Sequence, residues 1–161
     1  MKILKPIAML FIMLLFISCT GDSDNNEPDP VNVDDTNLSA IEAEILQLVN
    51  NHRRSQGSGT LEHNDIAYEA ALEHTNYMIS QGRISHDNFS QRADELYQRI
   101  PFQTIAENVA FRYPTAEAIV EAWLNSSGHR QNIEGNFTHT AICARKDSNG
   151  DYYFTQLFYR L

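Results

Sequence analysis

The chain has 161 residues, of which 42% are hydrophobic and 20% are charged, so it suits one globular domain. Its 12 basic and 21 acidic residues give a formal net charge of −9, and a chain this acidic lacks the surplus of Lys and Arg that would neutralise a phosphate backbone. Nucleic-acid binding is therefore excluded, and with only Cys19 and Cys143 a disulfide-stabilised miniprotein is excluded as well.

Residues 1–18 have the pattern of a bacterial lipoprotein signal. Lys2 and Lys5 precede an apolar run over 7–17, which is shorter than the roughly 20 residues of a membrane-spanning helix. The run ends in Phe-Ile-Ser-Cys, which resembles a lipobox whose cysteine, Cys19, carries the lipid. A signal cut at another bond, or an uncleaved anchor, is the alternative. We expect an extracytoplasmic protein anchored by lipid to the bacterial cell membrane, with the outer membrane or the cell surface as further options.

Residues 19–37 are predicted to form an acidic, disordered tether. The stretch is rich in Asp, Asn and Pro and almost free of large apolar side chains. It cannot bury enough surface to offset the entropy of ordering it. The folded domain is predicted over 38–161, and with lipid on Cys19 the thiol of Cys143 has no partner for a disulfide.

Four helices are predicted in the domain from helical periodicity and from their end signals. They are expected over residues 39–54, 64–82, 90–98 and 115–128. Ser39 and Glu42 form a capping-box pattern at the start of the first helix, Gly82 stops the second, and Thr115 caps the fourth.

The last third of the chain changes to strand character. The apolar run 138–144 and the aromatic run 152–159 flank an Asp-Ser-Asn-Gly turn signal, which predicts a hairpin. A further short strand is expected over 105–111. Helices enclosing a small antiparallel sheet, an α+β fold, is the economical architecture, with Trp123 in its core.

The candidate chemistry lies in the histidines and one acid, since the sequence has no phosphate-binding loop, nucleophile elbow, zinc-binding His-Glu-x-x-His or metal-spaced cysteine pair. His86 lies in a predicted loop and His129 just past a predicted helix end, so neither ring is needed for helical packing. Glu107 lies in an apolar segment, where an acid must be paired or functional because burying it alone is costly. His74 is on an apolar helical edge and is expected to be a hydrogen-bonded core residue.

Several motifs follow one another along the domain. They are Leu-Val-Asn-Asn-His-Arg at 48–53, Leu-Glu-His-Asn at 61–64, Ser-His at 85–86, Ala-Glu-Asn-Val-Ala at 106–110 and Trp-Leu-Asn-Ser-Ser-Gly-His-Arg-Gln-Asn-Ile at 123–133. Their order resembles the CAP (or SCP) superfamily of cysteine-rich secretory, antigen 5 and pathogenesis-related proteins, and in particular its short bacterial branch. The resemblance covers 41–158 and implies an α-β-α sandwich.

The resemblance also implies a cleft in which two histidines and one or two acids converge and hold a zinc-like ion. Matched residue by residue, the histidines are His86 and His129, and the first acid is Glu107. The second acid of fuller family members falls at Ser126, and its nearest substitute is Glu121 on the preceding helical turn. Two neutral imidazoles would supply two ligands of a tetrahedral zinc ion, while Glu107 would hold a histidine tautomer or act as general base.

Three functions are weighed on this basis. The first is a membrane-anchored CAP/SCP binding module rather than an enzyme, whose His/Glu cleft takes a metal ion, a small apolar ligand or lipid, or a cell-envelope component. The alternative is a metal-assisted or His/Glu-dependent hydrolase of peptides or cell-envelope polymer, against which the missing acid at Ser126 counts. The third is an adhesion or interaction domain with a vestigial cleft, in which the two histidines and Glu107 form a structural hydrogen-bond network.

Overall fold

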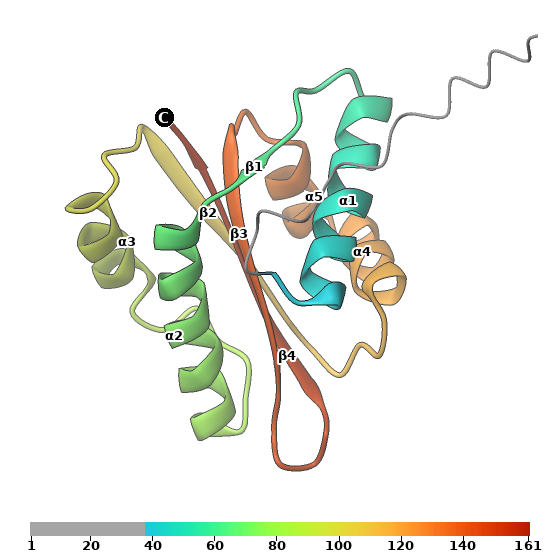
Figure 1. Ribbon diagram of the computed structural model, residues 1–161, viewed down its shortest axis with the longest axis vertical. Coiled ribbons are helices and arrows are strands. Elements are labelled where there is room, and N and C mark those ends of the chain that lie inside the picture. The colour runs from blue at the N-terminus through green and yellow to red at the C-terminus, as the bar shows by residue number, and fades with distance from the viewer. Residues whose placement is uncertain (1–37) are drawn as a thin grey trace, which may run out of the picture. The chain divides into compact units, whose positions relative to one another are not determined.

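The computed structural model describes residues 38–161 (Figure 1). The predicted signal over 1–18, the lipidation site Cys19 and the tether over 19–37 lie outside the described residues. Within the described part, the elements in chain order are α1 (Ala40–Ser55), β1 (Glu62–His63), α2 (Asp65–Gln81), α3 (Phe89–Tyr97), β2 (Thr104–Phe111), α4 (Ala116–Asn125), α5 (Ser127–Glu134), β3 (His139–Lys146) and β4 (Tyr152–Arg160). No helix in this part is long and apolar enough to cross a membrane.

The strands form one sheet in the order β1-β3-β4-β2. The predicted hairpin is β3 and β4, and β2 pairs antiparallel with the far side of β4, where Glu107 stands opposite Leu157. The sheet is mixed rather than purely antiparallel because the two-residue strand β1, which the sequence does not predict, runs parallel to β3. At the other end of the sheet, β2 is an edge strand, and this edge carries the site described below.

Helices cover both faces of the sheet, with α2 and α3 on one side and α1, α4 and α5 on the other (Figure 1). Each face has its own buried apolar cluster. The α1 side buries Ile45, Val49, Ile119, Trp123, Phe154 and Phe158; the α2 side buries Ala67, Ala71, Leu96, Ala141, Leu157 and Tyr159. The predicted α+β class, its α-β-α layering and the core position of Trp123 are confirmed.

The main difference from the predicted elements lies before His129. The helix expected over 115–128 ends at Asn125, and a second helix, α5, begins at Ser127. Ser126 breaks the helix because its backbone is extended, and its carbonyl accepts a hydrogen bond from Arg130 that opens the next helix. The expectation that His129 lies outside a helix was therefore wrong.

Glu42 does more than cap α1. Its carboxylate accepts a hydrogen bond from the Ser39 backbone, as the capping box predicts, and another from the Ser39 hydroxyl. It also accepts one from the backbone of Ala144 at 2.8 Å and one from Arg145 at 3.0 Å. Since β1 covers only one end of β3, this fully buried acid satisfies part of the open edge of β3 and fastens α1 to the sheet.

Candidate functional site

His86 lies on the loop between α2 and α3, which side chains of α2 hold in place. Gly82 ends α2 in a left-handed conformation, with φ of 63°, that favours glycine. His74 then donates from Nε2 to the Ser85 carbonyl at 2.8 Å, and the Tyr77 hydroxyl donates to Asp87 at 3.0 Å. The predicted burial and hydrogen bonding of His74 are confirmed, and its bond fixes the backbone next to His86, whose side chain is 55% exposed.

Glu107 presents a buried carboxylate on β2. Its side chain is only 2% exposed, and both of its oxygens are hydrogen-bonded. His86 donates from Nδ1 to Oε1 at 2.8 Å, while Arg92 on α3 donates to Oε2 at 2.6 Å and to Oε1 at 3.1 Å. The expectation that this acid is paired is confirmed. The partner that balances its charge is Arg92, which the sequence analysis did not identify.

His129 reaches the same region from α5, which two asparagines attach to the free edge of β2. Asn108 donates to the His129 carbonyl at 3.1 Å. Asn132, one turn further along α5, donates to the Glu107 carbonyl at 3.1 Å and to the Asn108 side chain at 2.8 Å. These bonds join the backbone of Glu107 to the helix that carries His129. We call His86, Arg92, Glu107 and His129 the edge cluster.

Burial keeps two histidine rings at this site neutral. It lowers the pKa of His129, and the nearby charge of His86 lowers it further. It also lowers the pKa of His74, although Glu107 and the bond to Ser85 oppose the shift. The structure thus joins His86 directly to Glu107 and attaches the backbone of His129 to Asn108, the next residue on β2.

The edge cluster fits a metal ion only in part. The bond from Nδ1 of His86 to Glu107 leaves the Nε2 lone pair of a neutral imidazole free, as in the carboxylate-histidine pairs that support metal ions. The neutral ring of His129 is the second nitrogen donor, while the oxygens of Glu107 are taken up by hydrogen bonds. Residues 38–161 contain no group of three or more His, Cys, Asp or Glu placed to hold a metal. The candidate metal ligands in this part of the chain are therefore the imidazoles of His86 and His129.

The structure gives no support to a second acid. Ser126 lies at the junction of α4 and α5. Glu121 is exposed on α4 and lines a hollow that also includes Leu48 of α1. Among the described residues, no hydrogen bond or ion pair links Glu121 to the edge cluster.

The α-β-α sandwich is the fold that the resemblance to CAP domains implied. The profile of the cysteine-rich secretory protein family, CAP, matches residues 46–158, and the chain belongs to this family. Two relatives from Bacillus subtilis (strain 168) are similar in sequence. The uncharacterized protein YkwD is 31% identical over 111 residues, and the uncharacterized membrane protein YlbC is 32% identical over 121 residues.

These matches cover 66% and 73% of this chain but only 43% and 34% of the relatives. The chain thus spans less than half the length of the curated relatives it matches.

Solved structures share the fold. An extracellular protein containing an SCP domain from Bacillus anthracis is 26% identical with a TM-score of 0.64, over 73% of this chain and 39% of that one. An outer surface protein from Borrelia burgdorferi is 19% identical with a TM-score of 0.64, over 72% and 89%. A cysteine-rich secretory protein from Staphylococcus aureus is 17% identical with a TM-score of 0.65, over 74% and 38%.

Proposed function

We propose that this protein is a CAP-domain binding module that acts outside the cytoplasm and binds a divalent metal ion of the zinc type, with a small ligand, at the edge cluster. The main observation in support of this proposal is the pair formed by His86 and Glu107. Nδ1 of His86 is fixed by a buried carboxylate at 2.8 Å, whereas the ring itself is more than half exposed. A histidine held in this way presents Nε2 to a ligand in one tautomer and one orientation.

His86 and His129 would hold the ion, and the remaining positions would be filled by water or by oxygen atoms of a bound molecule. A metal in such a site polarises the oxygen atoms that it binds. With two protein ligands the affinity is expected to be modest, so that metal and ligand support each other's binding. Arg92 and Glu107 support the site because the ion pair between them fixes the carboxylate that orients His86.

The same contacts count against the hydrolase alternative. A general base needs an oxygen or nitrogen that is free to take a proton from water. Both oxygens of Glu107 already accept hydrogen bonds from Arg92 and His86, and the carboxylate is buried. Within residues 38–161, no hydrogen bond or ion pair joins the cluster to Glu121, the proposed replacement for the second acid. Glu107 is therefore poorly placed to act as a general base, and a hydrolase would have to use Nε2 of His86, which these contacts leave free.

The extracytoplasmic location rests on two supports. The similar proteins include one described as extracellular, one as an outer surface protein and one as a membrane protein. The sequence pattern ending at Cys19 adds a lipid anchor in the bacterial membrane to this proposal. A Cys19→Ser variant should be recovered in the soluble fraction after export, whereas recovery in the membrane fraction at the level of the parent chain would contradict lipid anchoring.

Calorimetric titration of the full chain with zinc chloride tests the metal site. We expect saturable binding in the parent chain and in a His52→Ala control, whose histidine pairs with Glu134 at the end of α5. Binding should weaken at least about tenfold in His86→Ala and in His129→Ala. Equal binding in all four proteins, or none in the parent, would contradict the metal site. If the parent chain bound no zinc, the complete hydrogen bonding of Glu107 would favour an interaction domain in which the edge cluster is a structural hydrogen-bond network.

A further inference from the structure

Beside the edge cluster lies a hollow of about 320 Å³ that the histidines do not line. It is formed by one face of α3, the start of β2 and the segment between them. Four of its lining side chains are large and apolar or aromatic: Phe89, Tyr97, Phe102 and Ile105. Ser90 and Asp94 lie at its rim and are exposed. Its volume is at the lower end of the range for small-molecule sites, about 300–1,000 Å³.

Two aromatic rings give the hollow a corner with two flat walls. The rings of Tyr97 and Phe102 are perpendicular, with centroids 5.3 Å apart. Phe102 also packs against the buried ring of Tyr159, at 6.1 Å, which holds it in place. Tyr97 is 46% exposed, an uncommon position for a large aromatic side chain. The corner is therefore rigid on one side and open on the other.

Phe89 lines the hollow and also contacts two residues of the edge cluster. The backbone of Phe89 donates to the His86 carbonyl at 3.2 Å, and its ring lies 5.5 Å from the guanidinium of Arg92. Ile105 and Glu107 are two residues apart on β2, so their side chains share one face of the sheet. The hollow and the edge cluster are thus connected through Phe89 and through strand β2.

The charge of the hollow limits its occupant. Asp94 is the only charged side chain among the lining residues. A fatty acid or an anionic lipid headgroup would place a like charge beside this carboxylate, which disfavours both. An occupant that uses every feature of the hollow has a flat apolar face for the aromatic walls and hydroxyl groups for Asp94 and Ser90. A sugar ring has both, since its C–H groups form an apolar face and its hydroxyls surround the edge.

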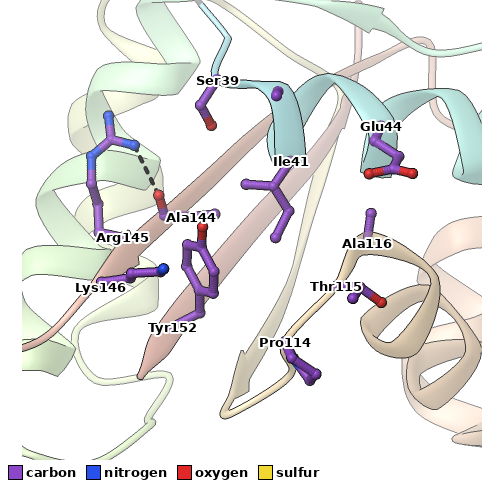
Figure 2. Close-up of a pocket in the computed structure, with 11 residues that line it drawn as sticks. Ser39, Ile41, Glu44, Pro114, Thr115, Ala116, Ala144, Arg145, Lys146 and Tyr152 are labelled. Atoms are coloured by element: carbon purple, nitrogen blue, oxygen red, sulfur yellow. Dashed lines mark hydrogen bonds between the residues drawn. The ribbon is translucent and has the colours of Figure 1, made fainter. Parts of the chain in front are cut away.

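We propose that this hollow is a binding subsite for a neutral sugar ring of a glycan. The inference deepens the proposed function, since it names the class of ligand that would lie next to the metal-binding histidines. Tyr97 and Phe102 stack against the ring, and Asp94 accepts hydrogen bonds from its hydroxyls. The hollow at the starts of α1 and α4 offers a contrast (Figure 2). There the ammonium of Lys146 lies 4.7 Å from the centre of the Tyr152 ring, so this ring already has a cationic partner. Arg145 of the same hollow is hydrogen-bonded to the Ala144 carbonyl.

The test is calorimetric titration of the full chain, in a detergent without a sugar headgroup, with two soluble neutral oligosaccharides, chitotetraose and cellotetraose. We expect at least one to bind, with affinity reduced about tenfold by Tyr97→Ala and several-fold by Asp94→Asn. Tyr152→Ala, an aromatic change in the other hollow, should bind like the parent chain. Tyr97 is at the surface, so its loss should leave the fold intact, and thermal unfolding of each variant checks this.

Absence of binding by both sugars at about 10 mM would overturn the inference, as would undiminished binding in Tyr97→Ala. It would also be overturned if dodecanoate or N-acetylphenylalaninamide bound in their place and were lost with Tyr97→Ala, because the occupant would then be a fatty acid or an aromatic peptide side chain. The same proteins separate this inference from the metal site. Tyr97→Ala should keep the zinc affinity of the parent, and His86→Ala should lose zinc while it still binds the sugar.

Discussion

Arg92 holds both carboxylate oxygens of Glu107, at 2.6 and 3.1 Å, across the gap between α3 and β2. The pair is largely removed from water, since the side chains are 14% and 2% exposed. It balances the one buried charge of the site and lets Glu107 accept a further hydrogen bond from His86. The orientation of the exposed histidine therefore depends on a guanidinium that shares Glu107 with it.

Replacing Arg92 with methionine should destabilise the fold strongly. The change leaves the buried carboxylate of Glu107 without its cation, for which a cost of about 3 kcal/mol or more in the free energy of unfolding is expected. Denaturant unfolding measures it. Arg99→Met is the matched control, since the ion pair of Arg99 with Glu69 is about half exposed and should contribute less than about 1 kcal/mol. Equal losses in the two variants would refute the role given to Arg92.

Asn132→Ala should weaken zinc binding without removing a ligand. Its side chain donates to the Glu107 carbonyl and to Asn108, so its loss loosens the helix that carries His129. We expect a loss of about 1–2 kcal/mol in stability and a several-fold weaker zinc affinity, by unfolding and by calorimetry. Asn125→Ala, an exposed change at the end of α4, should alter neither quantity. Unchanged zinc affinity in Asn132→Ala would show that the asparagines do not position His129.

The buried histidines should make the fold less stable in mild acid. Burial lowers the pKa of His63, His74 and His129 below 6.5, their ordinary value. As the pH falls below about 6.5, the unfolded chain takes up protons that the folded chain does not, so the free energy of unfolding decreases until the folded-state pKa values are passed.

Each ring contributes at most about 1.4 kcal/mol per pH unit within that window. His74→Gln keeps an amide that can donate to Ser85 and should reduce the slope between about pH 5 and 6.5. Unfolding curves at several pH values give the slope, and the same slope in parent and variant would contradict this origin.

Cys143 should be inert in the native protein. It is fully buried on β3, and burial raises the pKa of its thiol to about 11, so almost no thiolate is present at neutral pH. In a chain with Cys19→Ser, a thiol reagent such as dithionitrobenzoate should react only after denaturation. Prompt release of one equivalent of chromophore from the native chain would be the contrary result.

Local patterns in the sequence account for much of the fold. The capping box at Ser39 and Glu42, the stop at Gly82 and the turn between β3 and β4 all act over a few residues, and the structure has them where they were predicted. The extended backbone of Ser126, which separates α4 from α5, has no comparable signal in the chain. The parallel pairing of β1 depends on residues far apart in sequence and could not be read from periodicity.

The site was predictable to a similar degree. The cost of a buried acid indicated that Glu107 needs a partner, but nothing local selects Arg92, fifteen residues earlier on another element. His86 and His129 were singled out by their surroundings and by the family resemblance. The asparagines that connect β2 and α5 became evident only once these elements were placed side by side.

Nitrogen NMR of the histidine rings during zinc titration of the full chain tests the proposed metal site most directly. It reports which ring nitrogen binds the ion, with every other histidine in the chain as an internal control. We predict that zinc shifts Nε2 of His86 while Nδ1 stays protonated against Glu107, and that a ring nitrogen of His129 shifts with it. Shifts confined to His52, His63 or His139, or loss of the proton on Nδ1 of His86, would contradict the proposal.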